Sequence, residues 1–164
     1  MKKNFIKTQR LVLRPFCEED LIYLKELLKD IDVMKFSING PYDEKKTKGF
    51  IDSSIENQKE YGFGAMAVFL KNTDEWIGFC AIFREKEKIQ DFGFRFFKEY
   101  WGKGYATEAV SECCSYLKKN FPDEKIYCYI DPENKSSIRV AEKSNMTCLG
   151  KGHLPWIKCF KYQI

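Results

Sequence analysis

A strand that passes through a glycine-containing turn directly into a helix most limits how this chain can fold. The run "IQDFGFRFF" (89–97) predicts a strand, and "KEYWGKGY" follows it. From Tyr105 to Asn120 the apolar residues recur at helical spacing, as Ala106, Ala109, Val110, Cys113 and Leu117. The chain therefore combines strands and helices, and the turn between them is the first candidate for a binding site.

This turn has the properties of an anion cradle. The first turn of a helix leaves backbone N–H groups without partners and carries partial positive charge. Gly102 and Gly104 have no Cβ, so an anion can approach those N–H groups, and Lys103 adds a mobile charge. The residues predict a phosphate or pyrophosphate site, although a turn that needs glycine for its geometry alone would have the same sequence.

A second Gly-Lys-Gly stands at 150–152. It is followed by His-Leu-Pro-Trp and a strand pattern, so no helix N-terminus lies behind it. We predict a plain turn at this position.

Two known phosphate-binding motifs can be compared with residues 100–107. A P-loop is excluded, because Lys103 is followed by Gly104 rather than by Ser or Thr. A dinucleotide-binding turn remains an alternative, with Asp131 after the next strand as the ribose-binding acid. Against it, the third glycine position is Thr107, and Pro132 follows the acid.

The remaining patterns predict one mixed α/β domain over residues 1–164. The seven expected strands cover 10–16, 64–71, 75–83, 89–97, 125–130, 147–150 and 157–163. The expected helices cover 18–31, 43–61, 105–120 and 134–144.

Composition excludes several classes of function. The net charge of +4 is spread along the chain without a long basic run, so nucleic acid is not an expected partner. No leader-like segment and no 18-residue apolar run occurs, which favours a cytoplasmic protein without a membrane span. The seven cysteines include no CxxC pair, and the single histidine, His153, has no partner near it; we expect reduced thiols and no metal.

Three longer stretches carry a resemblance to a known family. "FGFRFFKEYWGKGYATEA", then "DPENKSSIRVAEKSNM" about 25 residues later, and the opening "TQRLVLRPFCEEDL" resemble the GNAT superfamily of acyl-CoA-dependent N-acyltransferases. The similarity is greatest to the branch that includes ribosomal-protein N-terminal acetyltransferases. The resemblance implies a mostly antiparallel sheet of about seven strands with flanking helices, splayed between the strands at 89–97 and 125–130.

The same resemblance implies a reaction. The protein would transfer an acetyl group from acetyl-CoA to a primary amine, either a protein N-terminus or a small molecule, by direct attack and without a metal. It would act as a monomer or homodimer. A non-catalytic CoA-binding or sensor domain and a dinucleotide-dependent oxidoreductase remain as alternatives.

The family's binding residues map onto this chain by position. The N–H groups that hold the pyrophosphate match Gly102, Lys103, Gly104, Tyr105, Ala106 and Thr107. The backbone that pairs with the pantetheine arm lies near Phe96 and Phe97, and the family's N-x-x-S positions match Asn134 and Ser137. Helix capping by Asn134 would explain that residue equally well.

The expected catalytic residues are Asp91 and Ser137. Where many relatives carry a tyrosine acid, this chain has Ala141, so reprotonation of the thiolate falls to Ser137 or to water. Asp91 stands where many relatives have a glutamate, and its apolar neighbours would raise its pKa toward that of a useful base.

The acceptor site is expected in residues 31–61. Acids in this segment could attract a cationic amine, although surface solvation explains them as well; they are Asp32, Asp43, Glu44, Asp52 and Glu56. A short connection, "HLPW", between the final strands is expected to open one side of the acceptor groove.

Overall fold

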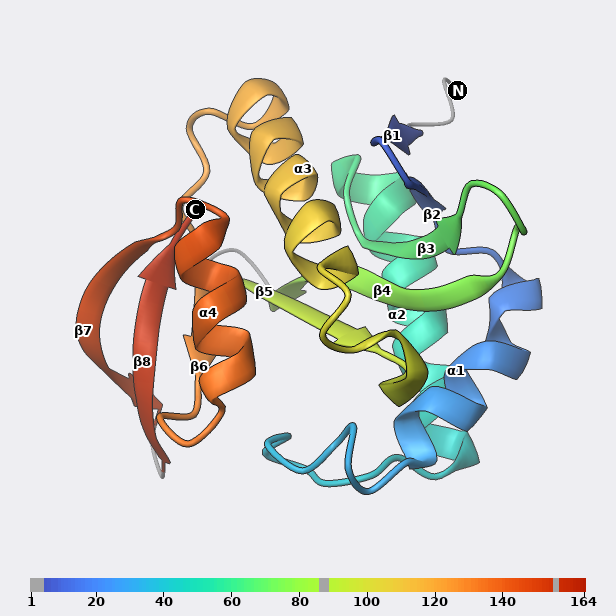
Figure 1. Ribbon diagram of the computed structural model, residues 1–164, viewed down its shortest axis with the longest axis horizontal. Coiled ribbons are helices and arrows are strands. Elements are labelled where there is room, and N and C mark those ends of the chain that lie inside the picture. The colour runs from blue at the N-terminus through green and yellow to red at the C-terminus, as the bar shows by residue number, and fades with distance from the viewer. Residues whose placement is uncertain (1–4, 86–88, 155–156) are drawn as a thin grey trace.

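A computed structural model describes residues 5–85, 89–154 and 157–164. Its eight-stranded sheet has the order β1-β2-β3-β4-β5-β6-β8-β7, with helices on both faces (Figure 1). The strands are β1 (Ile6–Lys7), β2 (Leu11–Pro15), β3 (Ala65–Leu70), β4 (Trp76–Glu85), β5 (Ile89–Phe96), β6 (Ile126–Ile130), β7 (Thr147–Leu154) and β8 (Ile157–Gln163). The helices are α1 (Leu21–Lys29), α2 (Glu44–Tyr61), α3 (Tyr105–Asn120) and α4 (Lys135–Lys143).

Each of the seven predicted strands exists, and the sheet gains one more at its edge. The additional strand, β1, pairs Ile6 with Leu13 and Lys7 with Val12. Two residues are too few to show a period-two pattern, so this strand could not be predicted from the sequence. In β2, Leu11 and Leu13 are fully buried while Val12 is half-buried, as the alternation predicted.

The turn predicted at 150–152 is wrong. These residues lie inside β7, where the pairing with β8 shifts register between Cys148 and Lys151. Gly150 has a φ of +88°, so it forms a bulge in the strand. The glycines at 150–152 therefore accommodate an irregular strand, whereas Gly102 and Gly104 precede a helix.

The helix predicted for 18–31 begins as a 3₁₀ turn (Glu18–Asp20), continues as α1 and ends at Lys29. Ile31, at the end of the predicted helix, lies beyond α1 and is 75% exposed. Asp20 is buried at the junction of the 3₁₀ turn and α1, where it accepts hydrogen bonds from three parts of the chain instead of serving as a solvated first-turn acid.

The sheet separates two apolar cores. On one face α1 and α2 cover a core that includes Leu24, Ile51 and Phe79. On the other face α3 covers a core that includes Phe92 and Val110. Side chains of a strand alternate between faces, so Phe92, Phe94 and Phe96 lie toward α3, while Asp91, Gly93 and Arg95 face the opposite way.

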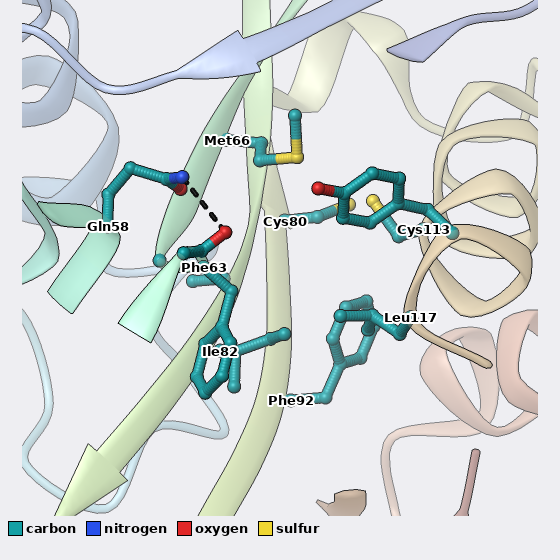
Figure 2. A pocket seen from close by; sticks show the side chains of 12 residues that line it. Gln58, Phe63, Met66, Cys80, Ile82, Phe92, Cys113 and Leu117 are labelled. Atoms are coloured by element: carbon teal, nitrogen blue, oxygen red, sulfur yellow. Dashed lines mark hydrogen bonds between the residues drawn. The ribbon is translucent and has the colours of Figure 1, made fainter. Parts of the chain in front are cut away.

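A small gap in the core, between α2, β4 and α3, is lined mainly by apolar side chains and thiols (Figure 2). Its volume is about 20 Å³, and Gln58 Nε2 donates to Gly62 O at its rim, at 3.0 Å. A space of this size is a packing defect and is too small for an organic ligand. Cys80 and Cys113 lie here, and all seven cysteines are free thiols, of which five are buried.

The sheet opens between β5 and β6. These strands are parallel, and their pairing is limited to Gln90 with Ile126 and Asp91 with Tyr127. Beyond Asp91 the two strands diverge, which confirms the predicted splay. Figure 1 shows the result: β6, β7, β8 and α4 form one part of the molecule, and the other strands with α1, α2 and α3 form the second.

Candidate active site

A cleft of about 810 Å³ occupies the opening between β5 and β6. Its other walls come from the turn at 101–107, from α4, and from residues 32–42 after α1, with single side chains from α2 and β4. Eight of the eleven predicted site residues line it, namely Asp91, Phe96, Gly102, Gly104, Ala106, Thr107, Asn134 and Ser137. Lys103, Tyr105 and Phe97 do not.

The glycine turn has the geometry expected of an anion cradle. Gly102 and Gly104 have φ values of +72° and +80°, in the left-handed region that favours glycine. Gly104 is the N-cap of α3, and no side chain caps this helix. The N–H groups of its first turn therefore face the cleft without a side-chain acceptor.

Lys103 and Tyr105 contribute to the turn through contacts on its outer side. The Lys103 ammonium lies over the ring of Tyr100, 5.6 Å from its centre. The Tyr105 ring lies under the guanidinium of Arg10, at 4.4 Å. Their side chains thus hold the turn, and only their backbone N–H groups remain for a ligand in the cleft.

Arg10 braces this turn from the far end of the chain. Its Nη1 donates to Lys103 O at 3.0 Å, and its Nε donates to Glu108 Oε2 on α3 at 2.7 Å. No sequence pattern predicts this role, because Arg10 and Lys103 lie 93 positions apart and no local pattern joins them.

The open edge of β5 offers backbone groups to the cleft. Phe97 N donates to Ile77 O on β4 at 3.0 Å, and alternation along an antiparallel ladder turns the backbone of Phe94 and Phe96 away from β4. The indole of Trp101 donates to Phe96 O at 2.8 Å. Of the two predicted pantetheine contacts, Phe96 therefore faces the opening, whereas the Phe97 amide already has a partner on β4.

Asn134 and Ser137 form the opposite wall. Asn134 is the N-cap of α4, where its Oδ1 accepts hydrogen bonds from Ser137 N at 3.2 Å and Ser136 Oγ at 3.0 Å. The capping role is therefore present. Because both residues also line the cleft, capping does not remove them from contact with a ligand.

Asp91 lies on the β5 wall at the point where the strands separate. Burial disfavours its charged form and raises its pKa to about 7, and the positive charge of Arg95 opposes this shift. A carboxyl group with this pKa is divided between its acid and base forms at neutral pH, as a general base requires.

The acids expected to attract an amine are mostly engaged elsewhere. Asp32 alone lines the cleft, and it accepts from Lys98 Nζ at 2.7 Å. Asp43 caps α2, Glu44 pairs with Lys25, and Asp52 pairs with Lys48. Glu56 is exposed and lies outside the cleft.

Two features are absent from the described residues. No group of three or more His, Cys, Asp and Glu side chains in these ranges is placed to hold a metal ion. No helix there is long and apolar enough to cross a membrane. Of the predicted "HLPW" connection, His153 and Leu154 belong to β7, and their side chains, like Pro155 and Trp156, lie outside the described set.

Comparison with known proteins defines the class. The family model described as "Acetyltransferase (GNAT) domain" matches residues 10–147, and the chain belongs to this family. The uncharacterized N-acetyltransferase YnaD of Bacillus subtilis (strain 168) is 30% identical over 159 residues, which is 92% of this chain and 91% of YnaD.

Solved structures give the same class. A GNAT-family acetyltransferase from Bacillus anthracis has a TM-score of 0.82 and 30% identity, with 98% of each chain covered. RimL, a ribosomal L7/L12 alpha-N-protein acetyltransferase in complex with coenzyme A, shares the fold with a TM-score of 0.80 at 16% identity, covering 98% of this chain and 97% of RimL. The expected family is confirmed, and nothing in these comparisons favours the oxidoreductase alternative.

Proposed function

We propose that this protein transfers an acetyl group from acetyl-CoA to a primary amine by direct attack of the amine on the thioester. One observation carries the proposal: the uncapped N-terminus of α3, behind two left-handed glycines, opens into the cleft between β5 and β6. A helix N-terminus of this kind supports a pyrophosphate site in the cleft. RimL, which shares the fold, was solved with coenzyme A.

The residues of the cleft fit the parts of acetyl-CoA. The N–H groups of residues 102–107 would hold the pyrophosphate, and the open edge of β5 at Phe96 would pair with the pantetheine arm. Arg139 and Lys143 line the cleft from α4 and supply positive charge for phosphate groups. Asn134 and Ser137 would face the arm from the opposite wall.

The reaction requires the amine nitrogen to lose two protons and the sulfur to gain one. An alkylammonium with a pKa of about 10 must lose a proton before its nitrogen can attack. Asp91 would accept this proton, directly or through a water. The new C–N bond then forms as the C–S bond breaks. The nitrogen gives up its second proton, which reaches the departing thiolate through Ser137 or water.

A matched pair of glycine substitutions tests the binding site. Gly102 and Gly150 both have positive φ, and a Cβ on either would meet nothing within 4 Å. Alanine at either position therefore introduces similar backbone strain, but only at Gly102 does it intrude on the cradle. We expect Gly102→Ala to weaken CoA binding at least about tenfold by calorimetry, because backbone N–H groups can no longer approach the pyrophosphate. Gly150→Ala should leave CoA affinity unchanged, and equal effects would refute the cradle.

Turnover tests the reaction itself. With acetyl-CoA and a panel of amines, thiol release should have a kcat/KM that rises as pH increases through about 7, where Asp91 ionises. Asp91→Asn should abolish this rise near pH 7. Its kcat/KM should recover partly at high pH, where the amine deprotonates unaided. CoA binding without turnover of any amine would support the sensor alternative instead.

A further inference from the structure

Arg95 is a cleft residue that the proposed reaction does not use. It lies two residues beyond Gly93 on β5 and four beyond Asp91, on the same face of the strand. Its cross-strand partner on β4 is Phe79, and both residues line the cleft. Arg95 therefore faces the acceptor side of the cleft, where α1, α2 and the segment between them meet the sheet.

The charge of Arg95 is not neutralised within the described part of the chain. Its one hydrogen bond there runs from Nη1 to Phe94 O, at 2.8 Å, and none of the ion pairs involves it. A guanidinium has five N–H donors in a planar fork and stays charged in proteins. A charge held in a half-buried position without an anionic partner is unfavourable, so a bound anion would stabilise this arrangement.

Asp91 supplies that anion only in part at neutral pH. It forms no ion pair with Arg95, and burial keeps its pKa near 7, so about half of these carboxyls are neutral. The other acid on this side, Asp32, accepts from Lys98, which also pairs with Asp30. A polycationic acceptor would therefore find few free carboxylates here.

The surrounding wall is apolar. Besides Phe79, the side chains of Met34, Tyr42 and Phe50 line this part of the cleft, from the α1–α2 segment and α2. Gly93, between Asp91 and Arg95, has no side chain and leaves room above the strand. A ligand that fits this part of the cleft therefore needs an apolar group, an anion for the Arg95 guanidinium and a basic group for the Asp91 carboxyl.

We propose that the acceptor is a free α-amino acid with an apolar side chain, whose carboxylate binds Arg95 while its amine lies toward Asp91. The proposal rests on the acetyl-transfer function above and names its acceptor. A bidentate Arg–carboxylate pair supplies both charge and orientation. The α-amine of a protein N-terminus lacks this adjacent carboxylate.

The test compares amino acids with their decarboxylated amines. L-phenylalanine is assayed against 2-phenylethylamine, and L-leucine against 3-methylbutylamine, with spermidine as the polycation, by thiol release from acetyl-CoA. We expect wild-type kcat/KM to be at least about tenfold higher for each amino acid than for its amine, because the amine leaves the half-buried guanidinium without a partner.

Variants of Arg95 then test whether this residue causes the preference for amino acids. Arg95→Gln should raise KM for the amino acid at least about tenfold and change the decarboxylated amine by less than about threefold. Arg95→Lys should recover part of the loss, since it keeps the charge without the fork. The control is Lys29→Met, an exposed cation on α1 outside the cleft, which should leave both substrates unchanged. Thermal unfolding confirms that each variant is folded.

The outcomes separate this inference from the function on which it rests. Equal use of amino acids and decarboxylated amines, or a preference for spermidine, would overturn the amino-acid assignment and leave acetyl transfer standing. An equal loss with both substrate types in Arg95→Gln would also overturn it. Turnover of none of the amines, with CoA binding intact, would overturn the proposed function itself.

Discussion

Asp91 illustrates how a single residue links the chemistry of the cleft to the stability of the fold. An aspartate in an unfolded chain ionises at about 3.9, whereas burial raises the pKa of Asp91 to about 7 in the folded protein. The folded state therefore binds this proton more tightly than the unfolded state does. Below about pH 4 Asp91 is protonated in both states and does not lower the free energy of unfolding. As the pH rises from about 4 through 7, the unfolded state ionises first, so the folded state loses stability.

Replacing Asp91 with asparagine should remove this pH dependence. We expect Asp91→Asn to be more stable than wild type at pH 8, with an advantage on the order of 2 kcal/mol larger there than at pH 5. The lost attraction to Arg95 reduces the advantage without changing its direction, since burial is the larger cause of the pKa shift. Urea unfolding of both proteins at several pH values measures it. A difference that stays constant from pH 5 to pH 8 would contradict the prediction.

At the scale of elements, local features of the site were predictable and distant contacts were not. The start of α3 at Tyr105 and the cap of α4 at Asn134 follow from residues within one helical turn. The brace from Arg10 to Lys103 joins positions far apart in sequence, and periodicity holds no information on such a pair. The same reason explains why Arg95 was missed: its surroundings come from several separate segments.

The brace predicts an indirect effect of Arg10 on cofactor binding. Arg10 does not line the cleft, yet its bonds to Lys103 O and Glu108 and its contact with Tyr105 fix the turn before α3. Arg10→Met should raise the Kd for CoA roughly three- to tenfold, as expected for the loss of one or two charge-assisted hydrogen bonds on a partly exposed side chain.

Calorimetry gives the affinity of the Arg10 variant, and hydrogen exchange should show faster exchange in residues 101–107. Lys7→Met, which removes an exposed cation from the neighbouring strand β1, is the control and should change neither quantity. A weaker affinity with unchanged exchange in the turn would show that Arg10 acts by another route.

At the scale of the whole molecule, the order in which the strands pair could not be predicted from the sequence patterns. Seven strands could be placed along the chain, but β8 lies between β6 and β7, and period-two alternation does not specify that order. Gly150 shows a similar limit. A glycine pattern typical of a turn also suits a bulge within a strand, and only the pairing with β8 distinguishes them.

The N-terminal part of the molecule is held together by a buried polar group that no motif indicated. Asp20, fully buried before α1, accepts from Arg14 Nη1 and Nη2 at 2.7 and 2.9 Å. It also accepts from Trp76 Nε1 on β4 at 3.2 Å and from Cys17 N at 2.9 Å. One carboxylate thus connects β2, β4 and the start of α1.

Removing this carboxylate should lower stability without changing the site. Asp20→Ala leaves Arg14 partly buried without its anion and the Trp76 indole without its acceptor, so we expect a loss of about 3–5 kcal/mol in the free energy of unfolding. Urea unfolding measures this loss, and Glu26→Ala, which removes an exposed partner of Lys29, should change stability by less than about 1 kcal/mol. Because Asp20 does not line the cleft, the folded Asp20→Ala protein should bind CoA within about twofold of wild type. A loss below 1 kcal/mol, or CoA binding that falls while the protein remains folded, would contradict a purely structural role for this network.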